Sequence, residues 1–197
     1  MQYTSLVGGL SLGVLVTAAT ASAAEPSFDC TKVGPQSTEA IVCSDPELAE
    51  LDVQLLQTYS AALGKVGNGR KKLTAEQRGW IKGQHDCWKA DDKRACLKNG
   101  YQYRRAELQT RYRLIKPIGS ATYVCDGGET IRASYYPTEP ASALVVRGKE
   151  TVFMTVQPAA SGARYSGGNA SVWEHQGEAA IRWSLDGPER LCRKTGP

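Results

Sequence analysis

The chain of 197 residues contains only two histidines, His85 and His175, and none of its six cysteines lies in a Cys-x-x-Cys pair. Protein zinc centres need clusters of His, Cys or carboxylate ligands, and redox dithiols commonly use the Cys-x-x-Cys spacing. Two histidines so far apart in the sequence form no such cluster. We therefore expect no metal centre, and no motif implies a cofactor.

Long apolar runs are also scarce, and the one that is present lies at the N-terminus. Leu6 to Val16 is apolar but shorter than the ~20 residues that a membrane span needs. A small-residue stretch follows it, in which Ala21-Ser22-Ala23 fits the rule for signal-peptide cleavage. The sequence thus predicts a signal peptide over residues 1–23 and an exported, periplasmic or secreted chain that starts near Ala24. No cysteine follows the run directly, so we expect no lipid anchor and no stable membrane anchor.

An exported chain with an even number of cysteines favours disulfide bonds. The cysteines are Cys30, Cys43, Cys87, Cys96, Cys125 and Cys192. The first four lie in a half of the chain that has helical periodicity, and the last two lie in a half with strand periodicity. This division reduces the number of plausible pairings.

The net charge of +4 excludes little, because it is modest and unevenly placed. Residues 25–116 carry 16 Lys and Arg against 12 Asp and Glu, whereas residues 117–197 carry eight of each. This excess is too small for a nucleic-acid footprint, and we expect an ordinary solvated surface. A weak affinity for the anionic cell envelope stays open.

Residues 37–112 have the apolar spacing of helices. Ser44-Asp45-Pro46-Glu47 has the pattern of a capping box, and an apolar stripe of three- and four-residue steps follows it. Gly64, Gly67 and Gly69 are expected to end that helix. Thr74-Ala75-Glu76-Gln77 predicts the start of a second helix, and a third is expected around Cys96 to Tyr112.

Two or three helices bury too little apolar surface to be stable without covalent staples. An antiparallel arrangement brings the start of the first long helix towards the end of the second. We therefore expect Cys30 or Cys43 to pair with Cys87 or Cys96, and of the two arrangements we favour Cys30–Cys87 with Cys43–Cys96.

After a linker at residues 116–120 the apolar period falls to two. Short strands in close succession indicate an antiparallel meander, and closure into a barrel removes its edges. A disulfide between Cys125, on the first strand, and Cys192 would close a loop of roughly 65 residues and contribute a few kcal/mol. Six strands are predicted, over residues 122–126, 130–136, 143–147, 151–157, 171–175 and 179–183.

The segment from Pro158 to Trp183 contains the residues best suited to chemistry or binding. Ser161 and His175 are a conceivable nucleophile and base, but Ser161 lies in neither a Gly-x-Ser-x-Gly nor a Ser-x-x-Lys motif. A barrel of about 75 residues also leaves little room for a substrate pocket. The small residues around Gly162 let the backbone approach another surface, although a plain turn is the simpler interpretation.

The remaining aromatic and basic residues have structural interpretations. Trp80 and Trp88 are expected on one helix face in the core, and Trp173 and Trp183 on neighbouring strands of the barrel. His85 is expected on a helix surface. Arg164 and Tyr165 are of the residue types that anchor protein interfaces.

The β half resembles the MliC/PliC-type inhibitors of c-type lysozyme. The matching motifs are Tyr123-Val124-Cys125, the Ser-Gly-x-x-Tyr loop from Ser161 to Tyr165, the segment from Trp173 to Ala179, and the closing Cys192. The helical half resembles the LprI-like domain, a four-cysteine helical module. Its matching motifs are residues 28–30 and 40–48, Gln77-Arg78-x-Trp80, Asp86-Cys87 and Cys96-Leu97.

These resemblances imply a fold and a partner. The fold is a two-domain α + β chain, with a disulfide-stapled helical domain over residues 24–115 and an antiparallel barrel of about eight strands over residues 121–197. The partner is c-type lysozyme, which uses one carboxylic acid and one carboxylate in catalysis. In the family, the loop serine and a basic residue after the tryptophan engage those two groups.

Carried onto this chain, the family mechanism makes Ser161 the hydroxyl partner and places His175 where many members have lysine. The resemblance implies a lysozyme-binding set of Ser161, Gly162, Ala163, Arg164, Tyr165, Trp173 and His175. The sequence therefore predicts a lysozyme inhibitor, not an enzyme. The alternative is an envelope- or peptidoglycan-associated binding module without inhibition, and a hydrolase is a distant third.

Overall fold

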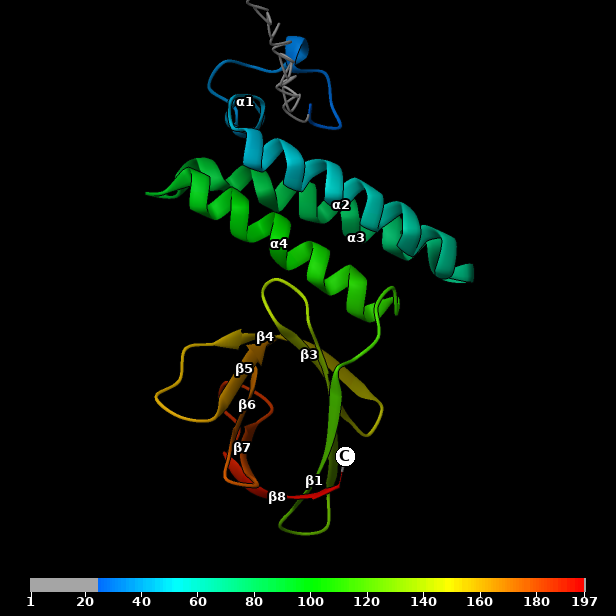
Figure 1. The fold of residues 1–197 in the computed structure, drawn as a ribbon, viewed down its shortest axis with the longest axis vertical. Coiled ribbons are helices and arrows are strands. Elements are labelled where there is room, and N and C mark those ends of the chain that lie inside the picture. Colours follow the sequence, from blue (N-terminus) through cyan, green and yellow to red (C-terminus); the bar gives the residue numbers. More distant parts are fainter. Residues whose placement is uncertain (1–24, 197) are drawn as a thin grey trace, which may run out of the picture.

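The computed structural model describes residues 25–196, so the predicted signal peptide over residues 1–23 and its cleavage site lie outside the described residues. The described chain forms four α-helices followed by eight strands, with the helices stacked on one side of a barrel (Figure 1). Within this part of the chain, no helix combines the length and the apolarity that a membrane crossing requires. The predicted α + β architecture is confirmed.

The helical half begins with a short 3-10 turn and contains three long helices, of which the middle one runs antiparallel to the other two. Its elements are η1 (Cys30–Lys32), α1 (Thr38–Ser44), α2 (Pro46–Lys65), η2 (Gly67–Gly69), α3 (Arg70–His85), η3 (Asp86–Lys89) and α4 (Lys93–Arg111). The start of α2 is capped by Asp45, whose carboxylate accepts hydrogen bonds from the backbone N–H groups of Glu47 and Leu48. The predicted capping box began at Ser44, so the observed cap lies one residue later than predicted.

The predicted start of the second helix at Thr74 is wrong, because α3 begins one turn earlier, at Arg70. The extra turn carries Leu73, which is fully buried in the core of the helical half. Burial of a leucine side chain contributes about 1.5–3 kcal/mol, which is more than the lack of a side-chain cap at Gly69 costs.

The two tryptophans of this region do not share one helix face. Trp80 lies on α3 and is half-buried against the core, where its ring meets Tyr101 at 5.5 Å. Trp88 lies on η3 and is 60% exposed, so the prediction that it belongs to the core is wrong. The physical reason is that α3 ends at His85, and the change to 3-10 geometry breaks the spacing that would align the two rings.

The favoured pairing of the first four cysteines is also wrong. The disulfides are Cys30–Cys43, which ties η1 to α1, and Cys87–Cys96, which ties η3 to α4. Both join cysteines close in sequence, with separations of 13 and 9 residues. They therefore staple local turns and do not cross-link the long helices.

Ion pairs, not a disulfide, join the segments beside Cys43 and Cys96, and they connect the start of α2 to the start of α4, whereas the end of the second long helix was expected there. Arg94, near the start of α4, donates to Asp45 at 2.5 Å and to Glu47 at 2.5 Å, at the start of α2. Lys98 adds a contact of 2.6 Å to Glu47. The segments around Cys43 and Cys96 therefore lie close together, but charged side chains and not the cysteines make the contact between them.

The second half is a closed antiparallel barrel in which each strand pairs with the next and β8 returns to β1. The strands are β1 (Gly119–Cys125), β2 (Thr130–Tyr136), β3 (Ser142–Arg147), β4 (Glu150–Gln157), β5 (Ala163–Gly167), β6 (Ala170–His175), β7 (Glu178–Arg182) and β8 (Arg190–Gly196). The residue pattern alone predicted six of them and missed β5 and β8. Strand β5 begins with Ala and ends with Gly, and β8 contains Lys and Gly, all of which are depleted in strands.

Alternate side chains of each strand fill the barrel. The interior includes Tyr123, Val145, Met154 and Val172, all of which are almost fully buried. The Cys125–Cys192 disulfide is confirmed, and it joins residues that are direct partners on β1 and β8. It therefore links the first and last strands at the seam where the barrel closes.

Helix α4 covers the outside of the barrel at β3 and β4. The ring of Tyr103 packs edge-on against Phe153 at 5.1 Å, and Gln102 donates to Glu139 in the β2–β3 loop at 3.2 Å. Phe153 alternates with the inward-facing Met154, so it points out of the barrel, yet it is only 2% exposed. The two halves thus share an apolar contact. Gly119 and Ser120, the last residues of the predicted linker, belong to β1.

Candidate functional site

The family motif residues gather at one end of the barrel, around the loop between β4 and β5. This loop runs over residues 158–162 and projects away from the barrel wall (Figure 1). Ala163, Arg164 and Tyr165, which were expected in the loop, form the start of β5. The loop is therefore shorter than the Ser161–Tyr165 motif suggested, and a strand holds its second half.

Gly162 fixes the shape of the loop. Its φ of +71° is in the left-handed region, and a Cβ atom built on it would lie 2.0 Å from the carbonyl oxygen of Glu174. Any other residue would therefore be strained and would also collide with β6. The close approach brings the loop backbone against β6, next to His175.

Trp173 holds the tip of the loop from the side. Its indole N–H donates to the backbone carbonyl oxygen of Ser161 at 2.9 Å, across the outer surface of β5 and β6. The indole is nevertheless 42% exposed, so it also presents apolar surface to solvent. The Ser161 side chain is exposed and makes no hydrogen bond within the described part of the chain, which leaves its hydroxyl available to a partner.

The register of β5 and β6 divides the predicted binding residues between the two surfaces of the barrel. Arg164 pairs with Trp173 on the outer surface, and His175, two residues along, points the same way. All three are exposed. Together with Ser161 and Gly162 they form what we call the loop face.

Tyr165 points the other way, into the mouth of the barrel. It is half-buried, and its ring lies 5.3 Å from that of Tyr135 on β2. Burial raises the pKa of its hydroxyl above the usual value. Ala163, also on the inward side, is half-buried. These two residues support the loop from beneath and are not part of its exposed surface.

Glu174, which the sequence did not single out, lies inside the barrel beneath the loop face. Glu174 accepts hydrogen bonds from the hydroxyls of Tyr123 at 2.5 Å and Tyr135 at 3.2 Å, and Lys194 lies 2.9 Å from its other oxygen. The two tyrosine hydroxyls are 2.8 Å apart. The signal that would have found it is the period of two, which turns Glu174 inward between the outward-facing Trp173 and His175.

The network sets the ionisation of its members. Burial opposes the charge of Glu174, but hydrogen bonds from Tyr123, Lys194 and Tyr135 outweigh it and hold the pKa of Glu174 below its usual value. Burial, followed by the interaction with Glu174, raises the pKa of Tyr123, and burial raises that of Tyr135 to about 12. At neutral pH the network therefore contains the carboxylate of Glu174 and two neutral tyrosine hydroxyls.

The arrangement lacks the features of a serine hydrolase. Ser161 and His175 lie near one another, but no hydrogen bond joins their side chains among residues 25–196. Glu174, the nearest carboxylate in sequence, points into the barrel and bonds to tyrosines. No group of three or more His, Cys, Asp and Glu side chains suited to a metal ion occurs in the same range.

His85, the other histidine, lies at the end of α3, where its Nε2 atom is 2.8 Å from a carboxylate oxygen of Glu39 on α1. The expectation of a helix-surface residue is consistent with its exposure, since half of its side chain is accessible. It lies in the helical half and is not part of the loop face.

Comparison with known proteins agrees with both halves of the chain. Residues 123–190 match the family described as membrane-bound lysozyme-inhibitor of c-type lysozyme, MliC. Lipoprotein LprI of Mycobacterium tuberculosis and of Mycobacterium bovis is 31% identical to this chain over an alignment of 197 residues, gaps included. The alignment covers 92% of this chain and 98% of the relative.

A solved structure is also similar, that of Pseudomonas aeruginosa MliC in complex with hen egg white lysozyme. It is 24% identical and covers 39% of this chain and 81% of that chain, with a TM-score of 0.33. This score is too low to support an argument. The sequence matches stand without it, since one covers the barrel and the other covers helices and barrel together. The chain belongs to the LprI family, and its barrel carries the MliC motif set.

Proposed function

We propose that this protein is an extracytoplasmic inhibitor of c-type lysozyme that acts through the loop face. The observation that supports this most directly is the match of residues 123–190 to a family of c-type lysozyme inhibitors, because this range includes the whole loop face. The described part of the chain also offers no catalytic constellation at that site.

The proposed mechanism is insertion of the β4–β5 loop into the substrate cleft of lysozyme. The geometry supports it in two ways. Gly162 and the small residues beside it let the backbone come close to another surface, and Trp173 anchors the carbonyl of Ser161 so that the exposed hydroxyl keeps a defined position. A loop that is ordered before binding loses less conformational entropy when it binds.

The proposed contacts are hydrogen bonds to the two catalytic carboxyl groups. Ser161 can donate from its hydroxyl, and His175 can donate from one ring nitrogen when neutral and from both when charged. Arg164 adds a positive charge on the same surface. Lysozyme needs both carboxyl groups for catalysis, so a protein that bonds to them blocks the cleft and occupies the reacting groups at once.

We also propose that the chain works in the cell envelope, in the periplasm or outside the cell. The family description and the lipoprotein relatives support an envelope-associated location. Three disulfides are consistent with it, because such bonds persist in oxidising compartments. The signal peptide over residues 1–23 remains a prediction.

The direct test is titration of the purified chain into a lysis assay with a c-type lysozyme. We expect stoichiometric loss of lysis at micromolar protein. Absence of inhibition, together with binding to purified peptidoglycan, would support an envelope-binding module instead. Turnover of ester or peptide substrates would support a hydrolase.

Replacement of Ser161 by alanine tests the mechanism. Loss of a hydrogen bond to a charged group costs about 1.5–3 kcal/mol, so Ser161→Ala should weaken inhibition by about tenfold or more. The melting temperature should not fall, because the hydroxyl is exposed. Ser60→Ala, which removes an exposed hydroxyl from α2, is the matched control and should leave inhibition unchanged. A Ser161→Ala variant that inhibits normally would exclude this hydroxyl from the contact.

A further inference from the structure

A cavity of about 550 Å³ lies in the helical half, away from the loop face. Its lining includes residues of three helices: Leu55 and Leu56 of α2, Trp80 and Ile81 of α3, and Tyr101 of α4. Pockets for small molecules usually measure ≈ 300–1,000 Å³, so this cavity has the size of a ligand site. Nothing in the lysozyme mechanism uses it.

The walls of the cavity are mainly apolar and aromatic. At its edge, Leu56 and Ile81 are 48% and 45% exposed, although both belong to helices whose neighbouring residues form the core. Deeper in, the rings of Trp80 and Tyr101 meet at a tilted angle. These walls fit an apolar body, and aromatic faces also attract a cation.

Three carboxylates line the cavity, and two of them already have a cationic partner. Asp29 lies 2.9 Å from Lys32, and Glu39 lies 2.8 Å from His85. Lys32 and His85 are the cationic or potentially cationic side chains among the lining residues. Each pair therefore contributes little net charge when both partners are ionised.

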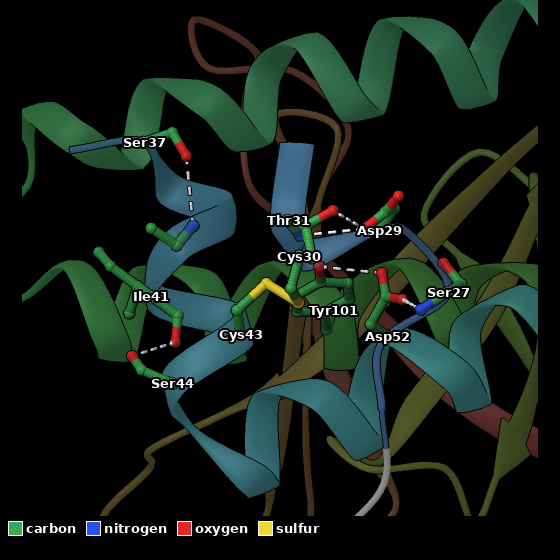
Figure 2. The surroundings of a disulfide bond; sticks show 11 residues. Ser27, Asp29, Cys30, Thr31, Ser37, Ile41, Cys43, Ser44, Asp52 and Tyr101 are labelled. Carbon is green, nitrogen blue, oxygen red and sulfur yellow. Dashed lines mark hydrogen bonds between the residues drawn. A yellow bond between two sulfur atoms is a disulfide. The ribbon is translucent and has the colours of Figure 1, made fainter. Parts of the chain in front are cut away.

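Asp52 on α2 is the third carboxylate, and it has neutral donors only. It accepts hydrogen bonds from the hydroxyl of Tyr101 at 3.1 Å and from the backbone N–H of Ser27 at 2.6 Å (Figure 2). No ion pair to Asp52 occurs within residues 25–196. Asp52 is half-buried, so its negative charge is only partly solvated and faces an apolar space.

We propose that this cavity binds a small amphipathic cation, a molecule with an apolar body and an ammonium group. The body lies against Trp80, Leu56 and Ile81, and the ammonium pairs with Asp52. A charge-assisted hydrogen bond to a carboxylate is stronger than a neutral one, and a cation here would neutralise the unpaired charge. The site is separate from the loop face and does not depend on lysozyme inhibition.

The test uses three probes with the same apolar chain and different charge: octylammonium, octanol and octanoate. Binding to the full chain is measured by isothermal titration calorimetry below the micelle concentration of each probe. We expect octylammonium to bind about tenfold tighter than octanoate, with octanol between them. Equal affinity for all three, or no binding of any, would overturn the proposal.

Two variants connect the charge preference to the cavity. Asp52→Asn should remove the preference for octylammonium and leave octanol binding unchanged, whereas Asp91→Asn, an exposed position outside the cavity, should keep it. Ile81→Lys places a positive charge at the exposed edge without disturbing buried groups. Among the three probes, this variant should weaken the binding of octylammonium most. A preference that survives both Asp52→Asn and Ile81→Lys would place the site elsewhere. Lysozyme inhibition should be unaffected in all three variants.

Discussion

At the scale of single residues, the loop face depends on two residues that fix the position of the loop backbone. Gly162 permits the close approach to β6, and Trp173 fixes the position of Ser161 through a carbonyl group. The hydroxyl that is proposed to meet lysozyme is therefore placed by its neighbours and not by its own contacts.

Trp173→Phe tests this positioning. The variant keeps an aromatic ring but removes the N–H that donates to Ser161. Because a hydrogen bond contributes about 0.5–1.5 kcal/mol, inhibition should weaken by about two- to tenfold. Trp88→Phe, a replacement of the exposed tryptophan on η3, is the control. Hydrogen exchange of the loop amides should be faster in Trp173→Phe alone, and unchanged exchange would contradict the anchoring role.

If His175 contacts the lysozyme cleft as proposed, inhibition should depend on pH. Two carboxyl groups of the cleft would favour the charged imidazole, so inhibition should strengthen between about pH 8 and about pH 5.5. On this chain, Glu178 is the residue directly opposite His175 on β7. His175→Lys keeps its charge over this range and should show a smaller change. Inhibition constants measured across the range, corrected for lysozyme's own titration, provide the comparison. A flat profile in the native chain would remove His175 from the contact.

At the scale of elements, β6 contributes to two structures at once because its side chains alternate. Trp173 and His175 form part of the loop face, while Glu174 between them enters the tyrosine network inside the barrel. The network fills the mouth of the barrel with polar groups that all have partners, so it supports the loop face rigidly.

The stability of the barrel should depend on pH through Glu174. Its pKa is lowered in the folded state, so its contribution is present above its unfolded pKa, near 4.5, and is lost as the pH falls through the lower folded value. Glu174→Gln should therefore be less stable than the native chain at pH 7, and the difference should narrow at about pH 3. Thermal unfolding at both pH values measures this. Glu178→Gln, exposed on β7, is the control. If the difference in stability between Glu174→Gln and the native chain were the same at both pH values, the contribution of Glu174 would come from packing and not from its charge.

At the scale of the whole molecule, the helical half is a partial cover for the barrel. Phe153 points outward and would be a large exposed aromatic residue without Tyr103 of α4. The backbone N–H of Ile118 also donates to Tyr135, so the barrel begins before the end of the predicted linker. A cut that preserves the barrel must therefore fall before Ile118.

A chain of residues 117–197 should keep lysozyme inhibition within about threefold, because the loop face lies away from α4. It should also self-associate more than the full chain, because Phe153 is uncovered. Phe153→Gln in this fragment should reduce self-association, and Phe153→Leu should not. Light scattering after gel filtration, with a lysis assay on the same samples, measures both properties. A folded fragment that no longer inhibits would assign part of the activity to the helices.

The sequence by itself determined the two-part architecture, the barrel disulfide and the motif set, because period, cysteine position and motif order are local in the chain. It did not determine which cysteines of the helical half pair, because both a local and a long-range pairing were compatible with the helix pattern, and the structure has the local pairs. It also could not place Tyr165 inside the barrel mouth and Arg164 outside. The placement of Tyr165 and Arg164 depends on the register between β5 and β6 and on closure of the barrel, which arise only when separate strands meet. The cavity beside Asp52 likewise depends on tertiary packing, because it is the space that four packed helices leave unfilled.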